Sequence, residues 1–380
     1  MRSKKVFSLL AIFLVVAASI MLLLEHQRPS AASTPAVPYV KGTQIIDASG
    51  KVLILRGAHI SSSFENYQSW FHNNGVTRRL NPTIFQEMNR NWHMNAVRIP
   101  LSNWIYSADP TNYLRMVDQV VQEANAAGLY TILNLHDDAP SGSPYGTGVD
   151  TPKPESIAFW KVFAAHYASN PMVLFDAFNE PMYPDGPTWL NGGGTMKGST
   201  GKTFAVVGMQ ALVNAIRSTG AKQIIIIGGT AYPLLYAKKT GIQLTIKDAN
   251  IVYTKHWYHE VSTGNPSLWD SWLGYFKGKA PIYFGEWALL PNSTIPIRCK
   301  GATMQNANQL VLNFLNYMNQ NGMSWTAWQF DAPHLLLNMS TFAPTRLNDP
   351  NHRWICNSPN STAGMGTVIQ RFLLSHSALT

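Results

Sequence analysis

Charged side chains are scarce in this sequence of 380 residues: Asp, Glu, Lys and Arg together make up 13%, against roughly 25% in an average soluble protein. Aromatic residues are plentiful, with 12 Trp, 15 Tyr and 16 Phe, which excludes the composition of a disordered chain. The basic residues are scattered rather than clustered, which argues against a nucleic-acid partner. We therefore expect a folded protein whose surface makes its contacts by aromatic stacking and hydrogen bonding.

Charges are absent from one long stretch near the N-terminus. After the basic start Met1-Arg-Ser-Lys-Lys, residues 6–24 contain 17 apolar residues out of 19. That layout predicts an export segment over residues 1–27, either a signal peptide or a signal anchor in the membrane. Residues 28–42, rich in Pro, Ala and Ser, are interpreted as a linker. The remaining body, 43–380, is expected to be a single domain and a monomer, secreted or membrane-anchored outside the cytoplasm.

Cysteine is also rare, with only Cys299 and Cys356. In an exported chain these two can form a disulfide, which the compartment favours over two free thiols. Neither cysteine has the spacing of a metal ligand or a nucleophile. The cysteines therefore point to no metal site and no thiol chemistry, and we expect the protein to use no metal and no cofactor.

Short apolar runs recur along the body, and continuous apolar character marks strands that are buried on both faces of a parallel sheet. The runs are Val52–Ala58, Ala96–Pro100, Tyr130–His136, Val173–Glu180, Gln223–Gly228, Ile251–Tyr258, Pro281–Trp287 and Ser324–Phe330. The clearest amphipathic helices between them are Pro82–Trp92, Asn112–Ala127, Pro154–Ser169, Thr203–Thr219 and Asn306–Asn319. Eight strands that alternate with helices predict a (β/α)8 TIM barrel.

Two further segments complete the expected fold. Thr43–Asp47 and Lys51–Leu55 flank Ala48-Ser-Gly50, which predicts a short N-terminal hairpin. The glycine-rich stretch from Asn191 to Lys202 resembles a phosphate-binding loop only superficially, because the first glycine of that motif would fall at Met196. A surface loop is expected there instead.

Polar residues end several of the predicted strands, which is where barrel enzymes carry their catalytic groups. Glu180 ends the fourth strand and Glu286 the seventh, 106 positions apart. That separation equals three strand–helix units of about 35 residues each, so the two carboxylates can face each other across the barrel mouth. Two converging carboxylates in different environments can divide the roles of acid and nucleophile.

At this point the sequence resembles glycoside hydrolase family 5, the cellulase-like enzymes. The matching motifs are Leu55-Arg56-Gly57, Val97-Arg98-Ile99-Pro100, Asn179-Glu180-Pro181, His256-Trp257-Tyr258, Gly285-Glu286-Trp287 and Trp328. The resemblance runs from about residue 43 to residue 375. Asn-Glu-Pro alone is a weak signal, but all these motifs in order, each at a strand end, are a specific one.

The resemblance implies a role for each matching residue. Glu286 would be the nucleophile and Glu180 the general acid and then the general base. The resemblance implies substrate-binding or supporting roles for Arg98, His136, Asn179, His256, Tyr258 and Trp328. Among these, Arg98 would keep Glu286 ionised, Tyr258 would orient it, and Trp328 would stack under the sugar ring.

Several residues keep a second interpretation. Arg98 could be a buried structural ion pair, and His136 a core histidine. The choice between His256 and His259 stays open, and Asp137 and Asp138 are too few for a cation site. The remaining tryptophans, either outer sugar platforms or ordinary packing, are Trp104, Trp189, Trp269 and Trp354.

The function expected from these observations is a retaining glycoside hydrolase, with endo-β-1,4-glucanase as the first expectation. Endo-β-mannanase and β-1,3- or exo-glucanase are alternatives, because glucose and mannose differ at a single hydroxyl group. Transfer to a sugar acceptor instead of water would use the same Glu180 base. A non-catalytic polysaccharide-binding barrel is the alternative from another class. In every case the expected partner is a β-linked polysaccharide or oligosaccharide.

Overall fold

The structure is a computed structural model that describes residues 37–61, 64, 80–137, 151–198, 201, 203–229, 239–241, 244–290, 301–348 and 363–376. The predicted export segment, Cys299, Cys356 and Asp138 lie outside this part of the chain, as does the side chain of Asp137. None of the helices in the described ranges combines the length and apolarity that a membrane crossing requires. Residues 37–380 form one compact unit.

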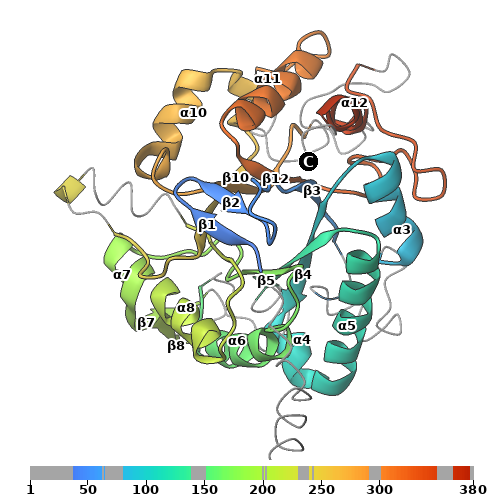
Figure 1. Cartoon of the computed structure of the whole chain (residues 1–380). Helices are drawn as coiled ribbons and strands as arrows, with labels where there is room; N and C mark the ends of the chain where they lie inside the picture. Colours follow the sequence, from blue (N-terminus) through green and yellow to red (C-terminus); the bar gives the residue numbers. More distant parts are fainter. Residues whose placement is uncertain are drawn as a thin grey trace, which may run out of the picture. The chain divides into compact units, whose positions relative to one another are not determined.

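Eight parallel strands close into a barrel in the order β10-β11-β12-β3-β4-β5-β6-β9, and helices surround this ring (Figure 1). The strands are β3 (Arg56–His59), β4 (Ala96–Ser102), β5 (Tyr130–Asp137), β6 (Val173–Asp176), β9 (Ile225–Ile227), β10 (Ile251–Trp257), β11 (Ile282–Trp287) and β12 (Ser324–Ala327). Each strand overlaps one of the eight apolar runs, and β3, β4 and β5 extend one or two residues past theirs. The predicted TIM barrel is therefore confirmed.

The helices carry apolar residues at the spacing that faces the strands. In α5, for example, Tyr113, Val117, Val121 and Ala124 are buried at steps of three or four residues. The α-helices are α3 (Pro82–Gln86), α4 (Asn103–Ala108), α5 (Pro110–Ala126), α6 (Pro154–His166), α7 (Gly186–Asn191), α8 (Met209–Ser218), α10 (Pro266–Leu273), α11 (Ala307–Gln320) and α12 (Gly366–His376). Shorter helical turns are the π-helix η1 (Glu87–Asn91) and the 3-10 helices η2 (Val261–Thr263) and η3 (Gly274–Phe276).

A small apolar cluster fills one end of the barrel. Ile132, Leu174, Ile226 and Val252 come from four different strands, and Ile45 of the N-terminal hairpin packs into the same cluster. The hairpin therefore closes the end where the strands begin, as its position over the ring in Figure 1 also shows. The opposite end, where the strands finish, is left for polar side chains.

The N-terminal hairpin differs in detail from the one expected. Strand β1 (Tyr39–Lys41) pairs with β2 (Gln44–Ile46) in antiparallel fashion, and Gly42 turns between them at φ 60°. The predicted second arm, Lys51–Leu55, contributes one isolated bridge between Val52 and Ile46. The Asp47 carboxylate accepts hydrogen bonds from the amides of Ser49 and Lys51, which shapes a side-chain-stabilised turn. The first strand within the described residues thus begins at Tyr39, inside the segment interpreted as a linker.

The helix expected over Thr203–Thr219 is wrong in its first third. Thr203–Val207 forms strand β8, which pairs with β7 (Gly192–Lys197), so the expected glycine-rich loop is also a strand. Helix α8 begins only at Met209, after the extended residue Gly208. Glycine has a low strand propensity, which hid β7 in the sequence. At Gly192, a side chain would clash with the backbone of Val206 and Gly208, so glycine permits this hairpin to close.

Candidate active site

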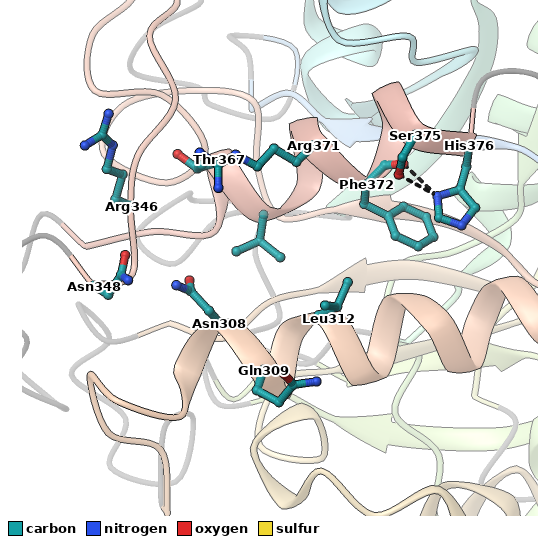
Figure 2. A pocket seen from close by; sticks show the side chains of 11 residues that line it. Asn308, Gln309, Leu312, Arg346, Asn348, Thr367, Arg371, Phe372, Ser375 and His376 are labelled. Carbon is teal, nitrogen blue, oxygen red and sulfur yellow. Dashed lines mark hydrogen bonds between the residues drawn. The ribbon is translucent and has the colours of Figure 1, made fainter.

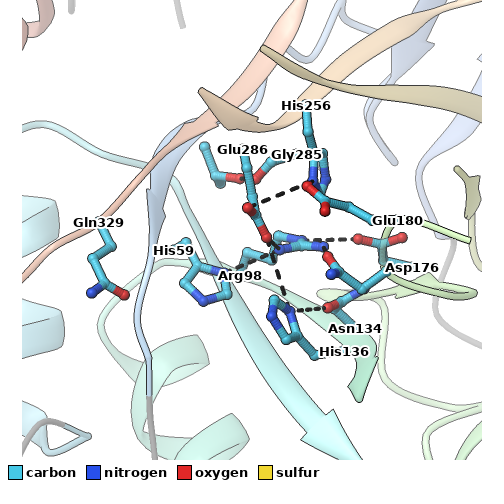
Figure 3. Close-up of polar contacts among 12 residues, drawn as sticks. His59, Arg98, Asn134, His136, Asp176, Glu180, His256, Gly285, Glu286 and Gln329 are labelled. Atoms are coloured by element: carbon cyan, nitrogen blue, oxygen red, sulfur yellow. Dashed lines mark hydrogen bonds and ion pairs between the residues drawn. The ribbon is translucent and has the colours of Figure 1, made fainter. Parts of the chain in front are cut away.

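All eight residues predicted for the site gather at the end of the barrel where the strands finish, and Figure 3 shows the polar core of this group. They lie on or directly after six strands: Arg98 on β4, His136 on β5, Asn179 and Glu180 after β6, His256 and Tyr258 on and after β10, Glu286 on β11 and Trp328 after β12. Residues from strands far apart in the sequence meet here because the barrel closes on itself.

Glu286 is the buried carboxylate of this group, with 4% of its surface exposed. Its Oε1 accepts a hydrogen bond of 2.8 Å from Arg98, and its Oε2 accepts one of 2.7 Å from the Tyr258 hydroxyl. Burial raises the pKa of Glu286, but the positive field of His256 and Arg98 outweighs it and holds the pKa well below its ordinary value. Glu286 is therefore an ionised, oriented carboxylate at neutral pH.

Arg98 connects three acidic or amide groups while being fully buried. Besides Glu286, it donates to Asp176 through Nε at 2.9 Å and to the Asn179 side-chain oxygen at 2.9 Å. Asp176 is also fully buried. The arginine is thus both the structural ion pair and the partner of Glu286, because its planar fork reaches both carboxylates at once.

Glu180 is the more exposed carboxylate, with 51% of its side chain accessible. Its Oε1 lies 2.7 Å from Nδ1 of His256, and its backbone adopts the left-handed region at φ 38°. Glu180, His256 and Glu286 each place one side-chain N or O atom within 4.8 Å of the others. A hollow of about 230 Å³ opens beside Glu180 and His256, bounded also by Gly228 and Gly229.

The two carboxylates have different electrostatic surroundings. The hydrogen bond with His256 lowers the pKa of Glu180, while burial and the negative charge of Glu286 act in the opposite direction. Arg98 makes no hydrogen bond to Glu180; its contacts go to Glu286, Asp176, Asn179 and His59. The protonation of Glu180 is therefore sensitive to the charge on Glu286 and to whatever covers its exposed side.

Three rings form one wall of the site. Trp328 stacks on His59 with ring centroids 4.5 Å apart, and His136 lies nearly parallel to the indole at 6.4 Å. Nδ1 of His136 is 2.9 Å from the side-chain oxygen of Asn134 and 3.9 Å from Oε1 of Glu286. Burial lowers the pKa of His136 to about 4 and that of His59 well below its usual value, so both imidazoles are neutral at neutral pH.

Two residues in this network were not predicted from the sequence, His59 and Asp176. Neither is the polar residue that ends its predicted strand: Asp176 stands inside the run Val173–Glu180, and His59 stands just past the run Val52–Ala58. Each carried a usable signal, because a charged or polar side chain within a buried strand needs a partner. Applied to Val173–Asp176, that rule would have predicted a buried partner for Asp176, which is Arg98.

The other open sequence interpretations are resolved where the chain is described. Trp104, Trp189 and Trp269 are buried, with 6%, 0% and 0% of their surfaces exposed, so they pack in the core. Trp354 lies outside the described residues. His256 rather than His259 contacts Glu180, since His259 lies beside Glu260.

Metal binding can be considered for two sets of side chains. His59 with His136 and Glu286, and Glu180 with His256 and Glu286, each place ligand-type atoms within 4.8 Å of one another. Glu286 belongs to both sets, and its charge is already matched by the fully buried Arg98 at 2.8 Å. We therefore assign neither set to a metal ion, since a cation would have to compete with this ion pair.

A larger hollow of about 530 Å³ lies elsewhere, between α11 and α12 (Figure 2). Among the described residues that line it are Asn308, Arg346, Arg371 and His376, with no Asp or Glu. The described residues of this groove therefore supply no carboxylate pair that could divide acid and nucleophile roles, unlike the end of the barrel that holds Glu180 and Glu286.

A closed parallel barrel with two converging carboxylates at the ends of its strands, one buried and ionised and one half-exposed, has the architecture of a barrel glycoside hydrolase. The sequence places the chain within this class. Residues 46–333 match the family model described as Cellulase (glycosyl hydrolase family 5). The chain therefore belongs to glycosyl hydrolase family 5 and is an enzyme that cleaves glycosidic bonds.

Curated relatives are distant but extensive. The chain is similar to an endoglucanase of Paenibacillus polymyxa, at 24% identity over 346 residues, covering 79% of this chain and 81% of the relative. Endoglucanase Z of Dickeya dadantii is 22% identical over 276 residues, which cover 72% of this chain and 57% of the relative. The chain thus spans most of the first relative and little more than half of the second.

Solved structures share the fold. A β-glucanase of Saccharophagus degradans superposes with a TM-score of 0.64 at 22% identity, covering 92% of this chain and 97% of that one. The catalytic domain of an endoglucanase of Thermobifida fusca superposes with a TM-score of 0.57 at 18% identity, covering 90% and 98% of the two chains. At these identities the superpositions show a common barrel.

Proposed function

We propose that this enzyme is a retaining endo-β-1,4-glucanase with Glu286 as nucleophile and Glu180 as acid/base. The observation that carries the retaining mechanism is the approach of the two carboxylates: an oxygen of Glu180 and one of Glu286 lie within 4.8 Å of each other. Retaining glycosidases separate their carboxyl groups by about 5–5.5 Å, whereas inverting ones need about 6.5–9.5 Å to admit a water. The short spacing favours retention.

In the first step Glu286 attacks the anomeric carbon while Glu180 gives its proton to the departing glycosidic oxygen. His256 and Arg98 keep the Glu286 carboxylate ionised, and the hydrogen bonds from Arg98 and Tyr258 fix it before attack, so little reorganisation is needed. Glu180 has to be protonated at this stage. A bound sugar covers its exposed side and removes water, which raises its pKa in the same direction as the charge of Glu286.

In the second step the charge on Glu286 is lost, which lowers the pKa of Glu180. Once Glu286 is bonded to the sugar it carries no charge, so its upward influence on the pKa of Glu180 disappears. The His256 contact then favours the Glu180 carboxylate, which can take a proton from water as water attacks the anomeric carbon and releases Glu286. One residue thereby serves as acid and then as base.

Around the reacting atoms, the remaining predicted residues have sugar-binding roles. Trp328 offers an indole face for stacking under a sugar ring. The Asn179 side-chain oxygen is held by Arg98, which leaves its amide NH₂ group for the sugar 2-hydroxyl. His136 lies beside Glu286 and would contact the same sugar.

A β-glucan substrate is supported by the activities for which related proteins are named. Several are endoglucanases, and the Saccharophagus degradans β-glucanase was also solved in complex with cellotetraose. We propose linear β-1,4-glucan for this chain. The check is a comparison of kcat/KM on linear β-1,4-glucan, mannan, mixed-linkage glucan, xyloglucan and β-1,3-glucan; a higher value on mannan or β-1,3-glucan contradicts the assignment.

The mechanism is tested by two variants that should both lose activity on glucan but differ on an aryl glycoside. Glu286→Ala should abolish hydrolysis of all substrates. Glu180→Gln should lose activity on glucan but keep the glycosylation burst on an aryl glycoside, whose leaving group needs no proton. Glu155→Gln, a substitution in the first turn of α6, is the control and should retain activity. Early NMR spectra should show a β-anomeric product, and an α-anomeric product contradicts retention.

We also propose that the enzyme is exported through residues 1–27, on the strength of the basic start and the apolar stretch that follows. Cell fractionation with N-terminal sequencing tests this. A mature N-terminus near Ala31 in the external fraction indicates a cleaved signal, and an intact N-terminus in the membrane fraction indicates an anchor. Recovery from the cytoplasm contradicts export.

A further inference from the structure

We propose that His59 is a positioning residue of this active site, which joins the Trp328 platform to the Arg98–Glu286 pair through its ring face and its Nδ1 lone pair. The inference rests on the proposed function, since it concerns how that nucleophile and that platform are held. His59 is the last residue of β3 and is fully buried. It faces Arg98 in the register between β3 and β4.

The first contact of His59 is with Arg98, which pairs with the nucleophile Glu286. Nδ1 of His59 lies 3.1 Å from NH1 of Arg98, the same nitrogen that donates to Glu286 at 2.8 Å (Figure 3). Because a guanidinium only donates, Nδ1 has to accept, and this fixes the neutral tautomer with hydrogen on Nε2. The four contacts of Arg98 then fix the orientation of its guanidinium plane. They thereby also fix where the positive charge lies relative to the Glu286 carboxylate.

The group that accepts a hydrogen bond from Arg98 at the position of His59 has to be uncharged. A third carboxylate beside Arg98 would share its positive charge and raise the pKa of Glu286, and a cation would repel Arg98. Neutral imidazole supplies a lone pair without either effect. The charged and titratable groups that act on His59 are Arg98, Glu286, His136 and His256, and its burial keeps it neutral among them.

The second contact runs to the sugar platform. The His59 ring covers one face of Trp328 at 4.5 Å and 24°. The backbone contributes as well, because the His59 carbonyl accepts a hydrogen bond from the amide of Phe330, two residues after the indole. The position of Trp328 and that of Arg98 are therefore set by the same residue.

The Nε2 atom of His59 indicates that packing alone does not explain a histidine at this position. It is buried and has no hydrogen-bond partner within the described part of the chain, and an unsatisfied buried donor destabilises the folded state. Phenylalanine would stack on Trp328 without this cost. What histidine adds at this position is the Nδ1 acceptor for Arg98.

Two variants separate the two contacts. His59→Phe keeps the stack and removes the acceptor, so kcat should fall roughly 10- to 100-fold with KM within about twofold, and the pKa of Glu286 should rise. His59→Asn places its amide oxygen near the Nδ1 position and removes the ring, so kcat and the pKa of Glu286 should stay near wild type while KM rises. Thr131→Val, a buried substitution on β5 that removes a bond with Asn125, is the control and should change stability alone.

The pKa of Glu286 is followed by NMR with carboxyl-labelled glutamate, which needs no turnover, beside kcat and KM on an aryl cellobioside. A wild-type enzyme that hydrolyses no glycoside contradicts the proposed function, while the NMR titration still tests the link from His59 to Glu286. Unchanged kcat and an unchanged Glu286 pKa in His59→Phe overturn the inference. So does an equal loss of kcat in both variants. Should His59→Phe fail to fold, a loss of kcat in a folded His59→Asn overturns it as well.

Discussion

Arg98 and Glu286 form a buried ion pair, 2.8 Å between NH1 and Oε1, in which neither side chain has more than 5% of its surface exposed. The same guanidinium holds Asp176 at 2.9 Å through Nε. One cation therefore stands between two buried carboxylates, of which only Glu286 has a proposed chemical role. The second carboxylate, Asp176, fixes the arginine so that its other edge remains directed at Glu286.

The strength of this arrangement is testable by a double-mutant cycle. Arg98→Leu should destabilise the protein by about 3–5 kcal/mol, because Asp176 and Glu286 stay buried and lose the cation that pairs with them. Part of that cost should be recovered when Asp176→Asn is added, which gives a coupling energy above about 1 kcal/mol.

The exposed pair Lys277–Asp270, with 32% and 44% of its side chains accessible, is the control, and its coupling should stay below about 1 kcal/mol. The measurement is the free energy of unfolding in urea. Equal couplings in the two pairs would mean that burial adds nothing to the Arg98–Asp176 interaction.

Removing His256 should move the whole pH profile upward. Its hydrogen bond lowers the pKa of Glu180, and its positive field, working against burial, lowers that of Glu286. In His256→Ala both pKa values rise, so both limbs of kcat/KM against pH shift to higher pH and the maximum falls. His259→Ala, at a neighbouring histidine with 45% of its side chain exposed, should leave both limbs in place. A shift in the control alone would contradict the assignment to His256.

His136 makes the protein less stable in mild acid. Its pKa in the folded protein is about 4 because burial disfavours the charged ring, while the ordinary value in an unfolded chain is about 6.5. The unfolded state therefore takes up a proton first, and stability present above pH 6.5 is lost as the pH falls toward 4, by at most about 3 kcal/mol. His59, whose pKa is also depressed, contributes with the same sign.

The test compares unfolding free energies of wild type and His136→Asn between pH 7 and pH 4. The variant should lose less stability over this interval, because asparagine does not titrate. Parallel curves for the two proteins would show that His136 is not the group that takes up the proton.

The barrel was predictable because each strand is buried on both faces and is therefore an unbroken apolar run. The segment around Gly192 and Thr203 shows where this fails. Strands β7 and β8 form a two-stranded hairpin in which β7 has no buried residue and β8 buries only Val206 and Val207. Neither strand therefore carries the long apolar run that marks the barrel strands, so local composition indicated a loop and a helix.

The site was predictable where a residue with a reactive side chain ends a strand, as the carboxylates Glu180 and Glu286 do. His59 and Asp176 lack that signal, because their importance comes from a neighbour on another strand. His59 faces Arg98 only through the register between β3 and β4, and Asp176 meets Arg98 across the barrel interior. Such pairings depend on the three-dimensional closure of the sheet, which a single sequence does not specify residue by residue.

The backbone of Glu180 has one further consequence. At φ 38° a residue with a Cβ is strained by about 1–2 kcal/mol, and glycine is not. Glu180→Gly should therefore be more stable than Glu180→Ala by about 1 kcal/mol, with both variants inactive on glucan. On the exposed helical residue Lys161, the same comparison should give the opposite order, since alanine is the better helix former by about 1 kcal/mol. Thermal unfolding of the four variants decides, and equal orders at both positions would contradict the strain. At position 180, selection for a more stable fold would therefore favour glycine, whereas selection for turnover would favour glutamate.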